Sequence, residues 1–186
     1  MSMDSMSNLE FALIGLKWDG YQYSKDFYFD MDISAFMLDK NDKLTNPSDF
    51  VFYNNPRSRN DAVVHSGDNR SNGDINVNET ITIDFSKIPD EITKVAVCVS
   101  IYDSEVRHVN FGQFYDAYVR IVQLACKNDK DGTPILLFDL GNEFSIESAL
   151  VVAEFRKNNG KWDCTAVSRS VRGGLEGICR LFGADV

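Results

Sequence analysis

Oxygen-bearing side chains are concentrated in one twelve-residue segment, 68–79, which reads DNRSNGDINVNE. Calcium takes about six to eight oxygen ligands, so a single loop must turn several side chains and a carbonyl inward. Measured against the EF-hand pattern, Asp68 stands at the first position, Gly73 at the sixth and Glu79 at the twelfth. A glycine permits the sharp turn, and a final glutamate can bind with both oxygens. This spacing indicates calcium chemistry.

The same segment departs from an EF-hand in two respects. Arg70 occupies the third position, and a guanidinium has no acceptor with which to ligate a cation. The flanking sequences VVHSG and TITIDF are typical of strands, whereas an EF-hand loop lies between helices. Two interpretations therefore stay open for this segment: a different kind of calcium loop, or a solvated turn rich in Asn, Asp and Gly.

Two further acidic clusters bear on that choice. Asp26, Asp30 and Asp32 lie in the run DFYFDMD, and strand alternation directs Asp30 and Asp32 to the same face. Like charges crowded on one face repel unless a cation lies between them, although the alternation also describes an ordinary half-exposed strand. Asp103 and Glu105 follow the apolar run VAVCVSIY and are expected to reach the same region from a strand end.

The elements that carry these clusters are predicted to be mainly strands. Runs rich in Val, Ile, Phe and Tyr alternate with clusters of Asn, Asp, Gly and Pro, which is typical of an all-β protein. We predict strands at 11–18, 32–38, 50–53, 80–84, 94–101, 117–124, 135–140, 148–157 and 161–167. The C-terminal apolar spacing predicts a short helix. The predicted fold is a two-sheet antiparallel β-sandwich with this helix packed on one sheet.

The chain length and charge limit the classes of function. A chain of 186 residues suits a single domain, 1–186, in which residues 1–10 form a disordered or partly ordered N-terminal segment. A net charge of −9 opposes binding to nucleic acid, and no apolar run is long enough for membrane insertion. Without a signal sequence, a cytoplasmic location is expected.

The four cysteines are widely spaced and form no CxxC pair, which disfavours a zinc site and a thioredoxin-type centre. Cys98 and Cys126 have apolar neighbours and are expected to be buried thiols in a reducing compartment. Neither His65 nor His108 lies in a recognised nucleophile signature, and the GGLEG sequence lacks the Lys of a P-loop. The chain is therefore predicted not to be an enzyme.

Several blocks of sequence resemble the TerD family of bacterial tellurium-resistance and stress-response proteins. These blocks are FDMDISAFML, DFVFYNN, HSGDNRSNGD, SIYDSEVRHVNFGQ with AYVRIV, and the closing GKWDCTAVSRSVRGGLEGICRLFGADV. The resemblance implies a calcium-binding β-sandwich, usually with two ions, that acts in resistance to tellurite and other chemical stress. It also implies other stress-response proteins as partners. The alternative is a protein–protein interaction module in which calcium is absent or purely structural.

The candidate calcium ligands come from the resemblance and the acidic segment together. They are Asp30, Asp32, Asp68, Asn69, Asp74, Asn78, Glu79, Asp103 and Glu105. The segment ends in Val77-Asn78-Glu79, where family members usually have two aspartates before the glutamate. Fewer carboxylates offset less of the dehydration cost of a divalent cation, so a lower affinity or the loss of one site is expected.

Overall fold

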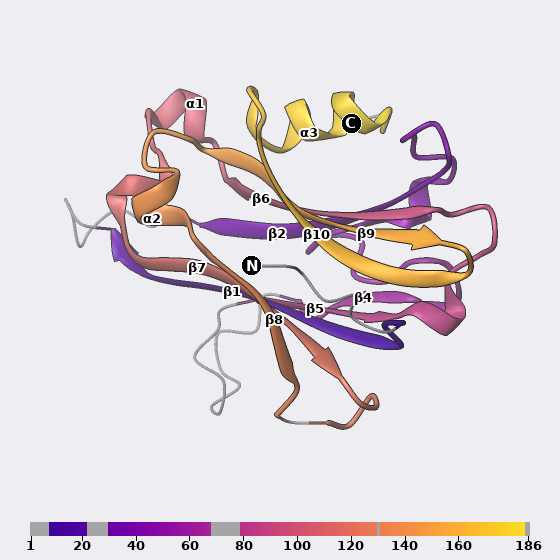
Figure 1. Ribbon diagram of the computed structural model, residues 1–186. Coiled ribbons are helices and arrows are strands. Elements are labelled where there is room, and N and C mark those ends of the chain that lie inside the picture. Colours follow the sequence, from indigo (N-terminus) through magenta and orange to yellow (C-terminus); the bar gives the residue numbers. More distant parts are fainter. Residues whose placement is uncertain (1–7, 22–29, 68–78, 130, 185–186) are drawn as a thin grey trace.

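Strands make up most of the described chain and form two antiparallel sheets that pack face to face (Figure 1). The computed structural model describes residues 8–21, 30–67, 79–129 and 131–184. Sheet A has the strand order β4-β5-β1-β7-β8, and sheet B has the order β10-β9-β6-β2-β3. The predicted two-sheet sandwich is confirmed.

The strands of sheet A are β4 (Val63–His65), β5 (Glu79–Asp84), β1 (Phe11–Tyr21), β7 (Phe114–Leu124) and β8 (Thr133–Asp139). The strands of sheet B are β10 (Lys161–Ser170), β9 (Ala149–Asn158), β6 (Lys94–Ile101), β2 (Met31–Leu38) and β3 (Phe50–Val51). The α-helices are α1 (Ser104–Arg107), α2 (Leu140–Glu143) and α3 (Gly174–Phe182). The 3₁₀ turns are η1 (Pro47–Asp49), η2 (Arg59–Asp61), η3 (Phe85–Lys87) and η4 (Phe111–Gln113).

The main core lies between the sheets and follows from strand alternation. Ile14 and Leu16 of β1 point inward from sheet A, and Ile33 of β2 and Val97 of β6 point inward from sheet B; all four are fully buried. Each buried side chain of this size contributes about 1.5 to 3 kcal/mol through removal of apolar surface from water. The alternation therefore decides which residues of each strand are left for the two outer faces.

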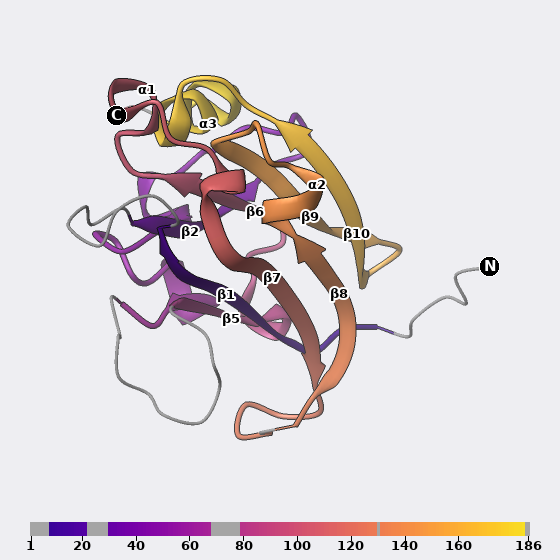
Figure 2. The same ribbon diagram turned by 90° about the vertical axis from the view of Figure 1, so that its left-hand side faces the viewer.

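A second apolar cluster covers the outer face of sheet B, where α3 lies across β6 and β9 (Figures 1 and 2). Ile178, Cys179 and Phe182 of the helix are buried, and the Phe182 ring lies 5.0 Å from the ring of Phe36 on β2. The helix ends at Gly183, whose φ of 75° is a left-handed conformation that glycine adopts without strain. The predicted C-terminal helix is confirmed.

The outer face of sheet A has no comparable cover in the described part of the chain (Figure 1). A hollow of about 900 Å³ opens there along β7 and β8, with Tyr118, Arg120 and Leu137 in its lining. Leu137 is 67% exposed and Tyr115 is 54% exposed, although both are large and largely apolar. The two outer faces of the sandwich thus differ: α3 covers one and leaves the other open.

All nine predicted strands are present, with small differences at their ends. β4 was not predicted as a separate strand, because three residues carry little periodicity, although its sequence VVH was correctly read as strand-like. Cys98 is buried as predicted, but the prediction for Cys126 is wrong. Cys126 is exposed just after β7 ends at Leu124, where the chain has left the apolar layer.

The N-terminal segment was expected to be at most partly ordered. Residues 1–7 lie outside the described residues, so that expectation is not examined for them. Leu9 is 1% exposed, and its N–H donates to the carbonyl of Trp162 at 3.1 Å. The chain therefore joins the core two residues before β1 begins.

Candidate metal-binding site

Two of the predicted acidic clusters meet at one end of sheet B. β2 and β6 are antiparallel neighbours in which Met31 pairs with Ile101, and the Tyr102 N–H donates to the Asp30 carbonyl at 3.0 Å. This register sets Asp30 directly across from the residue that precedes Asp103. The expectation that these clusters converge is therefore confirmed at the level of the backbone.

The third cluster reaches the same end from the other sheet. Glu79 begins β5, is 3% exposed, and shares the inward face of that strand with Ile81 and Ile83. Its Oε2 accepts a hydrogen bond from the Ile33 N–H of β2 at 2.9 Å. A side chain of sheet A thus bonds to the backbone of sheet B one residue from Asp32.

The buried histidine next to Glu79 belongs to β4. The His65 side chain is fully buried, and its Nε2 lies 3.5 Å from the Glu79 Oε2. The Gly67 N–H donates to the His65 Nδ1 at 2.9 Å. His65 is the last residue of β4, and its contact with Glu79 was not foreseen, because nothing in the sequence pairs the two.

The carboxylates at this end lie on two sides of β2. Met31 and Ile33 face the core between the sheets, so the intervening Asp32 faces the opposite side, whereas Glu79 enters from the core side. Asp32 is 8% exposed and lies near Tyr53: partial burial, followed by the charge of Asp32, raises the pKa of the Tyr53 hydroxyl. Asp32 and Glu79 therefore lie on opposite sides of β2, Asp32 on the outer side and Glu79 on the inner side.

The remaining described candidates are on the surface. Asp103 precedes α1 in a left-handed conformation with φ of 52°, and Glu105 lies in the first turn of that helix. The Asp103 Oδ2 lies 4.0 Å from the Arg107 Nη2, and both side chains are substantially exposed. An exposed ion pair at this separation stabilises little, so the carboxylate remains accessible to a second cation.

Four predicted ligands cannot be compared with the structure. Asp68, Asn69, Asp74 and Asn78 lie outside the described residues. The strands on either side are described: β4 and β5 are antiparallel, and His65 pairs with Ile81. The acidic segment is therefore flanked by two paired strands, whereas an EF-hand loop is flanked by helices.

The donor chemistry suits calcium better than a softer metal. The candidates around β2, β5 and α1 offer carboxylate oxygens, which are the ligands that Ca²⁺ prefers. Within the ranges that the structure describes, no group of three or more His, Cys, Asp or Glu side chains is arranged to hold a metal ion. The described residues thus fit calcium in kind but would need ligands from residues 68–78 to complete a coordination sphere.

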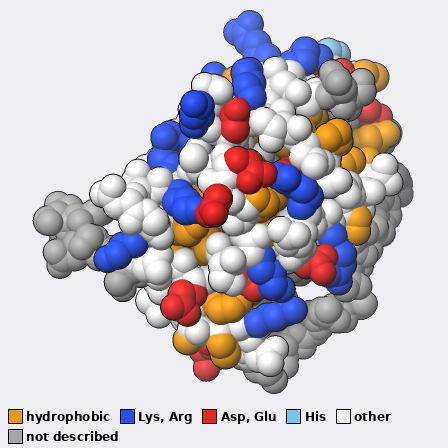
Figure 3. Space-filling model, turned by 90° about the vertical axis from the view of Figure 1, so that its right-hand side faces the viewer, with side chains coloured by type: hydrophobic (Ala, Val, Ile, Leu, Met, Phe, Trp, Pro, Cys, Tyr) orange, Lys and Arg blue, Asp and Glu red, His pale blue; other side chains and the backbone are white. Residues whose placement is uncertain are grey.

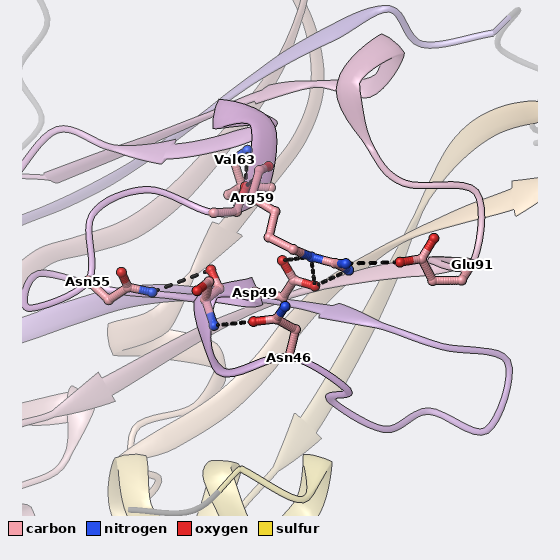
Figure 4. Close-up of polar contacts among 8 residues, drawn as sticks. Asn46, Asp49, Asn55, Arg59, Val63 and Glu91 are labelled. Carbon is pink, nitrogen blue, oxygen red and sulfur yellow. Dashed lines mark hydrogen bonds and ion pairs between the residues drawn. The ribbon is translucent and has the colours of Figure 1, made fainter.

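A different buried carboxylate has its charge balanced within the chain (Figure 4). Asp49 is 0% exposed, and both of its oxygens accept from the Arg59 Nε at 3.0 Å, while Nη2 donates to Oδ2 at 2.6 Å. Arg59 Nη1 also lies 3.0 Å from a carboxylate oxygen of Glu91. The hydrogen bond to Asp49 raises the pKa of Arg59. This network was not predicted, and its geometry marks it as structural.

Three of the four cysteine thiols have raised pKa values. Burial raises the pKa of Cys164 to about 12 and that of Cys179 to about 11, and it raises the pKa of Cys98 well above its usual value. Thiolates, which are the reactive form, are therefore rare at neutral pH at these positions.

On the face shown in Figure 3, Lys and Arg side chains gather along the upper-left edge, and over the rest of the face they are mixed with Asp and Glu side chains. Among the described helices, none is long and apolar enough to cross a membrane.

Comparison with known proteins gives consistent similarities. The TerD domain model matches residues 1–182. The uncharacterized protein YceE of Bacillus subtilis (strain 168) is 44% identical over 175 residues, with 94% of this chain and 88% of that protein covered. General stress protein 16U of the same organism is 37% identical with the same coverage. Tellurium resistance protein TerD of Serratia marcescens is 36% identical over 181 residues, with 97% of this chain and 90% of that protein covered.

Proposed function

The chain belongs to the TerD domain family, and from this membership we propose that it is a stress-response protein that contributes to resistance against tellurite and other chemical damage. Relatives named for general stress and for tellurium resistance support this role. The role is non-catalytic, since neither histidine belongs to a nucleophile–base pair. His65 is enclosed between Gly67 and Glu79, and His108 is exposed beside α1. We further propose a cytoplasmic location, in keeping with four free cysteines.

The molecular activity we propose is calcium binding at the end of the sandwich where β2, β5 and β6 meet. The observation that carries this proposal is the convergence of three acidic segments, fixed by the Tyr102–Asp30 and Ile33–Glu79 hydrogen bonds. Acidic groups from separate segments repel one another, and a divalent cation between them removes that repulsion. The proposed ligands are Asp30, Asp32, Asp68, Asn69, Asp74, Asn78, Glu79, Asp103 and Glu105.

The arrangement on two sides of β2 supports more than one ion position. An outer position would draw on Asp32 and Asp103, and an inner position would draw on Glu79 with the adjoining segment. Val77 and Asn78 precede Glu79 in place of carboxylates, which leaves the inner position with less negative charge. We therefore expect the weaker affinity at the inner position.

A calcium titration tests the proposal directly. Calcium at about 100 times its dissociation constant should stabilise the fold by about 2.7 kcal/mol, which corresponds to a rise in melting temperature of about 5 to 10 °C. Asp68→Ala should reduce that rise, whereas Asp90→Ala should not, because Asp90 is an exposed residue paired with Lys157 at 3.1 Å. Magnesium at equal concentration serves as the ion control. No shift of the wild-type protein at millimolar calcium would rule out the site.

A second candidate function is that of an interaction module for another stress-response protein, with calcium absent or structural. The uncovered outer face of sheet A favours it, because Leu137 and Tyr115 are exposed beside the hollow along β7 and β8. Large exposed apolar side chains around a hollow are typical of protein interaction sites. Arg120, also exposed there, would attract an acidic group of the partner.

Complementation separates the two candidates. A host strain that lacks its own TerD-family genes is supplied with the wild-type gene, Asp68→Ala or Leu137→Lys, and growth on tellurite is compared. If the function depends on calcium, the strain with Asp68→Ala should fail to grow on tellurite, and the strain with Leu137→Lys, a change in the lining of the sheet A hollow, should grow normally. If the protein is an interaction module, Leu137→Lys should fail and Asp68→Ala should grow normally. Equal protein abundance in all strains is the required control.

A further inference from the structure

The His65 side chain has a defined proton arrangement despite its burial. Its Nδ1 accepts the hydrogen bond from the Gly67 N–H at 2.9 Å, so this nitrogen carries no proton. In the neutral ring the proton therefore lies on Nε2, which faces the Glu79 Oε2 at 3.5 Å. Among the described residues, Nε2 has no hydrogen-bond partner, and the Glu79 Oε2 at 3.5 Å is a neighbour without a hydrogen bond. The ring thus accepts a hydrogen bond from one neighbour and places its second nitrogen 3.5 Å from the other.

Both neighbours of the ring stand at ends of the acidic segment. Gly67 directly precedes the segment, and Glu79 is its last residue and the first one described after Gly67. Backbone bonds close the same stem: the Ser66 N–H donates to the Thr80 carbonyl at 2.9 Å, and the Thr80 N–H donates to the Ser66 Oγ at 3.1 Å. These bonds join the strands, whereas the imidazole accepts from the Gly67 N–H and lies 3.5 Å from the Glu79 carboxylate.

The same contacts extend to sheet B. The Glu79 Oε2 that faces His65 also accepts from the Ile33 N–H at 2.9 Å. Ile33 is the neighbour of Asp32, so a line of three contacts runs from Gly67 through His65 and Glu79 to the strand that carries Asp32. An apolar side chain at position 65 would fill the same space, but it could neither accept from Gly67 nor direct a donor at Glu79.

We propose that His65 is a positioning residue for calcium binding, which holds Gly67 and the Glu79 carboxylate in fixed relation to the start of β2. This inference rests on the calcium-binding function proposed above. His65 does not ligate the ion; it acts through the two residues that bracket the acidic segment. Groups that orient ligands around a metal typically change its affinity by about 10-fold to 100-fold when they are replaced.

Two substitutions separate the two contacts of the ring. In His65→Asn the amide oxygen occupies the place of Nδ1 and retains the acceptor for Gly67, but the contact with Glu79 is lost. In His65→Gln the amide nitrogen occupies the place of Nε2 and retains a donor for Glu79, but the acceptor for Gly67 is lost. Val63→Ala is the matched control, since Val63 is a fully buried apolar residue on the same strand.

Calcium affinity is measured by calorimetry at a temperature at which every variant is folded by circular dichroism. We expect both His65 variants to bind calcium about 10-fold more weakly, and Val63→Ala to bind like the wild type despite its lower melting temperature. If both His65 variants bind within twofold of the wild type, the positioning role is overturned while the calcium function stands. If the wild type does not bind, the proposed function fails and the positioning role fails with it.

A second readout does not depend on calcium. In the presence of a chelator, amide hydrogen exchange of Gly67 should be roughly fivefold faster in His65→Gln than in His65→Asn, because only the glutamine variant lacks the acceptor. Exchange of the Ile33 amide should be faster in His65→Asn, in which the Glu79 carboxylate has lost its neighbour. Equal exchange of both amides in the two variants would overturn the proposed line of contacts whatever the calcium result.

Discussion

Asp49 and Glu79 are both buried carboxylates, 0% and 3% exposed, but the chain surrounds them differently. Asp49 is held by the guanidinium of Arg59 through three hydrogen bonds of 2.6 to 3.0 Å. Glu79 receives one backbone hydrogen bond from Ile33 at 2.9 Å and an imidazole nitrogen at 3.5 Å. The charge of Asp49 is neutralised by the guanidinium of Arg59, whereas the charge of Glu79 has a backbone N–H and an imidazole nitrogen as its described neighbours.

This difference separates a structural site from a candidate binding site. A buried carboxylate with its own guanidinium has no need of an external cation, and the pair serves to hold η1 against η2. Glu79 instead lies where other acidic segments gather, and its described contacts are a backbone N–H at 2.9 Å and an imidazole nitrogen at 3.5 Å. The environment of the charge, rather than its burial, indicates where a metal ion would bind.

The largest expected effect tests the structural side of this comparison. Asp49→Asn removes the charge but almost none of the volume, and it leaves the partly buried Arg59 without its main partner. We expect a loss of about 3 kcal/mol in the free energy of unfolding, because breaking a buried ion pair strands the remaining charge. Denaturant unfolding followed by circular dichroism measures it.

The double variant Asp49→Leu with Arg59→Met provides the control for that result. It removes both charges, so a large part of the lost stability should return. A loss of less than about 1 kcal/mol in Asp49→Asn would contradict the structural role and remove the contrast with Glu79.

Much of the fold follows from local sequence patterns. Strand alternation and turn chemistry predict nine of the ten described strands, and the turn between β9 and β10 has positive φ values of 50° at Asn159 and 77° at Gly160. The strand that escaped prediction, β4, is three residues long and is stabilised by its pairing with β5 rather than by its own pattern. Local signals predict an element well only where the element is long enough to repeat them.

The candidate site was predictable only in part. The acidic residues themselves are visible in the sequence, and β2–β6 pairing brings two clusters together as expected. The partners of the buried carboxylates were not visible, because Arg59 and Asp49, or His65 and Glu79, meet through tertiary packing that no spacing records. The sequence therefore indicated the candidate calcium ligands, and the structure adds the contacts of Glu79 with Ile33 and His65.

A smaller effect is expected for the isosteric change at the second carboxylate. Glu79→Gln retains an oxygen that can accept from the Ile33 N–H, but it replaces a charged acceptor with a neutral one. The expected loss is about 1 kcal/mol in the absence of calcium, the usual difference between charged and neutral hydrogen bonds. Denaturant unfolding in a chelator, beside Asp49→Asn, measures it under matched conditions.

The relative stability losses of Glu79→Gln and Asp49→Asn test whether the two buried carboxylates have different roles. If Glu79→Gln costs as much as Asp49→Asn in a chelator, Glu79 is also a primarily structural charge. If it costs little stability but abolishes the stabilisation by added calcium, the carboxylate belongs to the binding site as proposed.

The smallest effect concerns the outer edge of the Asp49 network. The Glu91 carboxylate accepts a hydrogen bond from the Glu91 backbone N–H and lies near the Arg59 side chain. Both contacts lower the pKa of Glu91, the backbone hydrogen bond more strongly. Because the folded state favours the ionised form, the stabilisation is complete above the unfolded pKa near 4.3 and is lost as the pH falls through the lower folded pKa. Glu91→Gln should therefore melt about 1 to 2 °C below the wild type at pH 7, as expected for an exposed pair.

At pH 3 the difference between the wild type and Glu91→Gln should disappear, since protonation of Glu91 removes the same charge as the substitution. Melting curves at the two pH values, recorded by circular dichroism, are sufficient to test this. A difference that persists unchanged at pH 3 would show that Glu91 contributes through packing rather than charge. The buried Asp49–Arg59 pair would then be complete without its exposed third member, which would sharpen the contrast with Glu79.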